Sequence, residues 1–234
     1  MSVPARRVLA EFIGTAFLVM AVVGSGIMAS RLSPDDVGLQ LLQNSLATGA
    51  ALVALVVALQ PVSAAFNPVV TLVERALGMI DTRTAAALIA AQFLGGLAGT
   101  VTAHLMFGLD AVTFSTRERT GTGLWLGEVI ATIGLLLVIF GTVRSGRAEQ
   151  VAFAVGGYIT AAYWFTSSTS FANPAVTIAR TLTDTFAGIA PASAPGFILA
   201  QLAGGAAGYA LIRVLYPTLA DSPAAIAATR KVLS

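Results

Sequence analysis

The chain has 234 residues, of which 56% are hydrophobic and 10% are charged, and its formal net charge is +2. So few polar side chains cannot cover the surface of a water-soluble domain of this length, so the composition predicts a membrane protein. Cysteine is absent and there is a single histidine, which excludes thiolate and histidine-cluster metal sites. The sparse arginines form no basic patch, so no nucleic-acid partner is expected.

Six apolar stretches are long enough to cross a bilayer, because a transmembrane helix needs about 20 apolar residues to span roughly 30 Å of hydrocarbon. The alternating pattern of a transmembrane β-barrel is missing. The sequence therefore predicts an all-α membrane protein embedded in a lipid bilayer. The six expected spans cover residues 8–30, 38–60, 84–108, 122–143, 151–170 and 194–216.

Three short motifs occur twice in the same order, at offsets of 117, 106 and 109 residues. This repetition predicts two halves, about 1–112 and 120–220, within a single membrane domain, 1–234, that ends in a short tail, 217–234. Each half holds three spans, so the second half must enter the membrane from the opposite side, which makes the repeats inverted. The motif pairs are AEFIGT at 10–15 with GEVIAT at 127–132, NPVVT at 67–71 with NPAVT at 173–177, and AQFLGG at 91–96 with AQLAGG at 200–205.

The arginines and lysine predict which side of the membrane each loop faces, because cytoplasmic loops are enriched in positive charge. With the N-terminus in the cytoplasm, the outer loops hold Arg31, Arg117 and Arg119, diluted by acidic residues. Both termini are therefore expected in the cytoplasm. The inner set is Arg6, Arg7, Arg83, Arg144, Arg147, Arg230 and Lys231.

The paired Asn-Pro boxes predict two short helices. Asparagine is a good N-cap and proline a good first helical residue, and about 11 helical residues after each box reach only about 16 Å, half a bilayer. Such segments must be buried in protein or line a wet cavity. One copy alone is equally compatible with an ordinary interfacial turn, but two copies at matching places favour re-entrant half-helices. The expected half-helices run from Asn67 to Leu77 and from Asn173 to Thr183.

Inverted repeats would bring the two half-helix N-termini together at the membrane midplane. Each N-terminus presents unpaired N–H groups and about half a positive charge. Together with the amides of Asn67 and Asn173, these ends would accept a neutral oxygen-bearing solute and repel cations. The pattern predicts a filter with no catalytic group.

These residues resemble the aquaporin, or major intrinsic protein, family, whose members carry two Asn-Pro-Ala boxes on re-entrant half-helices. The resemblance runs from about Glu11 to about Gly208. It implies six transmembrane helices with two half-helices, one pore per protomer and a homotetramer, and no cofactor. By the resemblance, Asn67 and Asn173 are the pore donors, Glu11 and Glu128 hold the loop backbones, and Pro68, Val69, Pro174 and Ala175 cap the half-helices. Snorkelling to the interface remains an alternative for Glu11.

The sequence departs from the family at the outer constriction. Typical members have arginine where this chain has Val176, and many have histidine where it has Ala65. The family spacing places the other ring positions at Thr48 or Ala47, at Ala161, and at Ser170 or Phe171. Such a ring predicts a wide, weakly polar opening without an arginine.

Arg180 lies four residues after Val176 and should share its helical face. It is either a displaced selectivity arginine or, as we prefer from sequence, a half-helix end residue that meets solvent or pairs with Asp184. His104, inside an apolar span, is expected to be structural.

The stretch from Phe171 to Phe186 is similar to a bacterial branch of the family that is associated with arsenic resistance and lacks the filter arginine. That resemblance implies a bacterial inner or plasma membrane protein that passes neutral trivalent metalloids such as arsenous acid. A secondary transporter and a closed structural protein of the same fold are the alternatives. The chain has no nucleophile and base constellation, so no enzyme is expected.

Overall fold

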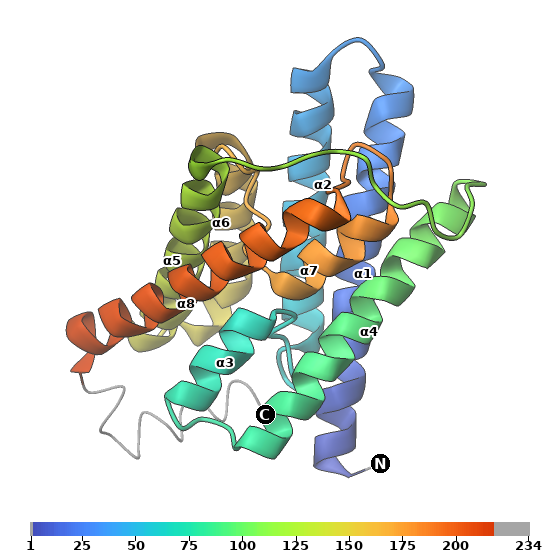
Figure 1. Cartoon of the computed structure of the whole chain (residues 1–234). Coiled ribbons are helices and arrows are strands. Elements are labelled where there is room, and N and C mark those ends of the chain that lie inside the picture. Colours follow the sequence, from blue (N-terminus) through green and yellow to red (C-terminus); the bar gives the residue numbers. More distant parts are fainter. Residues whose placement is uncertain (1, 218–234) are drawn as a thin grey trace.

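The computed structural model describes residues 2–217, which form helices and loops without a β-strand (Figure 1). Most of the expected tail lies outside the described residues. Two short helices, α3 (Pro68–Ala76) and α7 (Pro174–Ala179), accompany six longer ones. The longer helices are α1 (Val3–Leu32), α2 (Val37–Leu59), α4 (Thr82–Met106), α5 (Thr122–Arg144), α6 (Val151–Phe165) and α8 (Ala194–Leu215), and single 3₁₀ turns cover Ala148–Gln150, Arg180–Leu182 and Pro191–Ser193.

The two halves have the same internal plan. In the first half α1 packs along α4, in the second α5 packs along α8, and α2 packs against α6 to join the halves. Glycines let the paired helices approach closely: a Cβ built on Gly95 would lie 2.3 Å from the Phe12 carbonyl oxygen, and one on Gly204 would lie 2.7 Å from that of Val129. Small-residue faces of this kind are typical of helix packing within membranes.

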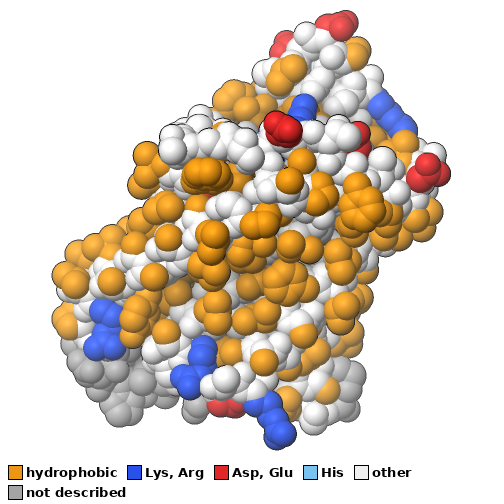
Figure 2. All heavy atoms as spheres, viewed as in Figure 1, with side chains coloured by type: hydrophobic (Ala, Val, Ile, Leu, Met, Phe, Trp, Pro, Cys, Tyr) orange, Lys and Arg blue, Asp and Glu red, His pale blue; other side chains and the backbone are white. Residues whose placement is uncertain are grey.

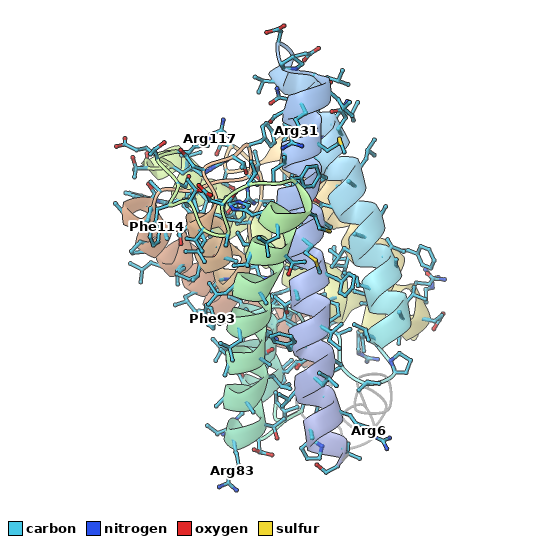
Figure 3. The ribbon with its side chains drawn as sticks, turned by 90° about the vertical axis from the view of Figure 1, so that its right-hand side faces the viewer. Arg6, Arg31, Arg83, Phe93, Phe114 and Arg117 are labelled. Carbon is cyan, nitrogen blue, oxygen red and sulfur yellow. The ribbon has the colours of Figure 1, made fainter. Side chains whose placement is uncertain are left out.

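The surface supports the membrane assignment. Figure 2 shows hydrophobic side chains over the middle of the molecule and charged side chains at its two ends. Five segments within the described residues are long and apolar enough to cross a membrane. Arg6 and Arg83 lie at one end and Arg31 and Arg117 toward the other (Figure 3), so the residues that the charge pattern assigned to opposite sides are separated in space.

The fifth expected span, 151–170, is helical only to Phe165. Its 15 residues reach about 22 Å at 1.5 Å each. Hydroxyl side chains occupy all of 166–170, and Thr169 and Ser170 adopt positive φ angles of 63° and 50°. Serine and threonine offer the backbone local hydrogen bonds that compete with a helix, so an apolar stretch that reads as one span divides into a helix and a descending loop.

Both half-helices begin at their Asn-Pro boxes and end earlier than the sequence predicted. Asn67 caps α3 by accepting the Val69 amide at 2.9 Å, and Asn173 caps α7 by accepting the Ala175 amide at 3.0 Å. The α-helical part of α7 stops at Ala179 and continues as one 3₁₀ turn. The two helices contact each other in the middle of the molecule, α3 entering from one end and α7 from the other (Figure 1).

Candidate solute pore

The two box asparagines bind each other's loops. The Asn67 side-chain amide donates to the Ala172 carbonyl at 2.7 Å, and the Asn173 amide donates to the Phe66 carbonyl at 2.7 Å. A side-chain amide carries two N–H groups, so each asparagine has a second one to offer. Both asparagines line the same cavity.

The residue before each asparagine adopts a left-handed backbone conformation. Phe66 has φ of 47° and Ala172 has φ of 46°. Such conformations cost about 1–2 kcal/mol for a residue with a Cβ, so the surrounding contacts must hold them. These conformations direct the Phe66 and Ala172 carbonyls toward the side-chain amides of the opposite box. The strained backbone is therefore part of the reciprocal hydrogen bonding between the two boxes.

Glu11 holds the loop before α3. It is fully buried, and its carboxylate accepts the Phe66 amide at 2.7 Å, the Ala65 amide at 2.9 Å and the Ser63 hydroxyl at 2.6 Å. A buried carboxylate is tolerated where such donors surround it. Since Glu11 is turned into the protein, the alternative that it snorkels to the interface is excluded.

Glu128 holds the loop before α7 in the same way. It is also fully buried, and it accepts the Phe171 and Ala172 amides, each at 2.8 Å. The two carboxylates therefore occupy equivalent places in the inverted halves, each bound to the two residues that precede a box asparagine.

Two glutamines, to which no role was assigned from the sequence, complete the anchors. Gln92 donates to Glu11 at 2.8 Å and to the Thr71 hydroxyl at 2.9 Å. Gln201 donates to Glu128 at 2.6 Å and to the Thr177 hydroxyl at 2.9 Å. All three repeated motifs thus converge on one hydrogen-bonded cluster per half, and the repetition of Ala-Gln beside the other two motifs was the signal that could have predicted it.

A single cavity runs between the halves past both boxes, and its space of about 90 Å³ has room for several waters at roughly 10–15 Å³ each. Polar groups enter it at a few places in an otherwise apolar wall. We call its two ends the Arg180 end and the Gln60 end. The Arg180 end is lined by Thr48, Tyr163, Ser170, Phe171, Val176 and Arg180, and the Gln60 end by Gln60, Glu74, Val143 and Val151.

Four of the six expected ring residues line the cavity: Thr48, Ser170, Phe171 and Val176. The expectation for Ala161 is wrong, because this residue is exposed on the outer face of α6. Two residues further on, Tyr163 faces the cavity, and its hydroxyl donates to Thr48 at 3.2 Å. Ala47, the alternative to Thr48, is half-buried and does not line the cavity. Counting residues by the family spacing missed Tyr163, because that spacing does not determine which face of α6 points toward the cavity.

Arg180 lines the cavity, so the preferred sequence interpretation, a solvent-facing residue paired with Asp184, is wrong. Its side chain is 3% exposed, donates through Nε to the Ala187 carbonyl, and stacks on the Phe171 ring. Asp184 is exposed and instead accepts from the Thr116 amide at 2.9 Å. The opening that was expected to lack an arginine therefore has one, a turn beyond Val176.

Two more arginines surround this end. The guanidinium of Arg119 lies 5.1 Å from the Phe171 ring centroid and donates to the Gly188 carbonyl at 2.9 Å, and Arg117 donates to the Phe186 carbonyl. Burial, and then the neighbouring positive charge of Arg117, lower the pKa of Arg119 to about 10. It stays charged near neutral pH, so the Arg180 end is electropositive.

His104 has the structural role expected from the sequence. Its Nδ1 lies 2.7 Å from the Asp110 carbonyl oxygen and its Nε2 lies 2.7 Å from the Thr183 hydroxyl. It ties the end of α4 to two loops, away from the cavity lining.

Six long helices, two half-helices meeting at their capped N-termini and a cavity between inverted halves define a class of membrane channel proteins. The sequence matches the model of the Major intrinsic protein family over residues 2–150 and 143–234. The chain belongs to this family, the aquaporins, whose members are channels and not enzymes.

Three relatives illustrate the similarity. The chain is 52% identical to "Aquaglyceroporin AqpS" of Rhizobium meliloti (strain 1021) over 211 residues, which cover 90% of each chain. It is 33% identical to the "Lens fiber major intrinsic protein" of Oryctolagus cuniculus over 68% of this chain and 62% of that protein. The solved structure of the aquaglyceroporin from Plasmodium falciparum shares the fold with a TM-score of 0.71, at 20% identity, over 92% of this chain and 98% of that one.

Proposed function

We propose that the protein is a passive channel for small uncharged solutes, namely water, glycerol-like polyols and neutral trivalent metalloids such as arsenous acid. The observation that carries this proposal is the meeting of two capped half-helix N-termini whose asparagine amides line one cavity. An uncharged hydroxyl oxygen accepts hydrogen bonds from such donors. A cation meets two positive helix ends and is repelled.

The ring at the Arg180 end supports solutes larger than water. Val176 offers an apolar side chain where typical family members have arginine, and Thr48 and Tyr163 offer hydroxyls on the facing wall. A wall that is apolar on one side and hydroxylated on the other suits a polyol, which has a carbon backbone and a row of hydroxyls. The relative of Rhizobium meliloti is named an aquaglyceroporin, which agrees with a polyol pathway.

Arsenous acid fits the same wall, because near neutral pH it is an uncharged molecule with three hydroxyls. Its support is the resemblance of the stretch after Asn173 to the arsenic-associated branch, together with the valine at position 176. Arsenite uptake measured beside glycerol uptake tests this part of the proposal.

We further infer a homotetramer in a bacterial inner or plasma membrane, with the N- and C-termini cytoplasmic. The exposed apolar belt in Figure 2 exceeds what a soluble monomer presents, and it is available to lipid and to neighbouring copies. With this orientation the Arg180 end faces outward and the Gln60 end faces the cytoplasm.

The test is stopped-flow uptake of water, glycerol and arsenite at neutral pH by proteoliposomes that contain the purified protein. We expect uptake of all three above that of protein-free vesicles, linear in solute concentration. Absence of swelling with every solute would favour a closed structural protein. Saturable uptake driven by a proton or sodium gradient would favour a secondary transporter.

A further inference from the structure

A carboxylate lines the end of the cavity opposite Arg180. Glu74 is 4% exposed, lies in the last turn of α3 and shares the Gln60 end with Gln60, Val143 and Val151. Among the described lining residues, Glu74 is the only acidic side chain and Arg180 the only lysine or arginine. They place an acidic and a basic side chain at the two mouths of one passage.

The position of Glu74 is unfavourable for folding. The C-terminal end of a helix carries about half a negative charge, so an acidic residue there is repelled by the carbonyls around it. Glu11 adds a second negative charge, and only Arg7 opposes it. Within the described residues, α4 and α8, which also pack against α3, contribute no further charge to this site.

Glu74 also differs from the two anchoring carboxylates in its hydrogen bonding. Glu11 and Glu128 accept backbone amides, whereas in the described part of the chain no donor binds the Glu74 carboxyl. Its side chain lines the cavity at the Gln60 end. A buried acidic residue at a helix C-terminus with no hydrogen-bond donor does not stabilise the fold, so a functional role is expected for it.

The rest of the cavity explains what this charge is for. Arg180, Arg119 and the two half-helix N-termini all repel cations, and the same positive field attracts anions. A channel restricted to uncharged solutes therefore needs a separate element against anions, and the wall between the boxes and the Gln60 end is otherwise apolar.

We propose that Glu74 is a specificity-determining residue that prevents small anions from passing the Gln60 end. This rests on the proposed channel function. Anions drawn to the Arg180 end meet a carboxylate at the other mouth, whereas neutral polyols meet an additional hydrogen-bond acceptor. The barrier exists when the carboxyl is ionised, so anion exclusion weakens as the pH falls.

The test compares the wild type with Glu74→Gln and Glu74→Asp in proteoliposomes at pH 9, where the carboxyl is ionised. Nitrate entry is followed by swelling in potassium nitrate with valinomycin, and glycerol entry is followed on the same vesicles. We expect Glu74→Gln, which keeps the size and hydrogen bonding of the side chain, to raise nitrate permeability about tenfold. Glu74→Asp retains the charge and should exclude nitrate as the wild type does.

Glu149→Gln is the matched control, because Glu149 is an exposed glutamate in the 3₁₀ turn whose Ala148 carbonyl binds Gln60. It should change neither flux. Glycerol flux within twofold of the wild type shows that the variants fold and conduct. A Glu74→Gln protein that conducts glycerol and excludes nitrate overturns the proposal.

Acidification gives a second test on the wild-type protein, which needs no variant to fold. Nitrate permeability should rise between pH 9 and pH 6 in the wild type and stay flat in Glu74→Gln. A flat wild-type profile contradicts the proposal. Absence of glycerol flux in the wild type would instead refute the channel function itself, so the two failures are distinguishable.

Discussion

The guanidinium carbon of Arg180 lies 3.4 Å from the centroid of the Phe171 ring, and both residues line the cavity. The arginine follows Val176 by four residues, one helical turn, and its Nε is bound by the Ala187 carbonyl. The ring and the carbonyl together fix a positive charge at a site that is not the family's usual one. The cavity therefore keeps an arginine while leaving the Val176 side of its wall apolar.

Replacing Arg180 by methionine should increase cation leakage. The substitution keeps an unbranched side chain over Phe171 and removes the charge, so we expect proton permeability to rise about tenfold. A pH-sensitive dye trapped in proteoliposomes measures it. Arg31→Met is the control, since Arg31 also lies over a ring, that of Phe107 at 5.1 Å, but is outside the cavity. Equal leakage from both variants would contradict a barrier role for Arg180.

Replacing Val176 by arginine should narrow the pore. A second guanidinium one turn from Arg180 fills the apolar side of the wall, so glycerol and arsenite permeabilities should fall at least about tenfold while water permeability is retained. Stopped-flow uptake at matched protein density measures all three. Unchanged metalloid flux in this variant would count against Val176 as a filter residue.

Removing either anchoring carboxylate should destabilise the fold. Glu128→Leu leaves the Phe171 and Ala172 amides buried without a partner, and each unsatisfied donor costs about 1–3 kcal/mol. Thermal unfolding in detergent, followed by circular dichroism, should show a lower midpoint for Glu128→Leu and Glu11→Leu. Glu118→Leu, at an exposed loop position, should unfold near the wild-type temperature. Wild-type midpoints for both variants would show that the loops before α3 and α7 do not depend on these carboxylates for stability.

A methyl group at Gly95 should separate α1 from α4. The added Cβ would lie 2.3 Å from the Phe12 carbonyl oxygen, so Gly95→Ala should destabilise by about 1–3 kcal/mol through overpacking. At Gly157, by contrast, nothing lies within 4 Å of an added Cβ, so Gly157→Ala should stabilise by roughly 0.5–1 kcal/mol through helix propensity. The same unfolding assay measures both. If both variants changed the unfolding midpoint equally and in the same direction, the close approach of α1 and α4 at Gly95 would be contradicted.

The anchors show how far repetition in a sequence reaches. Doubling of the glutamate, Asn-Pro and Ala-Gln motifs predicted two inverted halves, and the family resemblance assigned Glu11 and Glu128 to the loops whose amides they bind. It did not show that Gln92 and Gln201 connect each carboxylate to a threonine of the neighbouring box. These partners lie 81 and 73 positions from their carboxylates, a separation that only the packing of α1 on α4 and α5 on α8 removes.

The sequence by itself determined the membrane class, the inverted repeat and the box asparagines, because hydrophobic length, repeated order and helix-capping chemistry are local properties of the chain. Only the tertiary structure decided that Tyr163 faces the cavity in place of Ala161, that Arg180 turns inward onto Phe171, and that Glu74 faces the opposite mouth. The rotation of a helix about its axis and the environment of a charge depend on neighbours far away in the sequence, so no local pattern determines them.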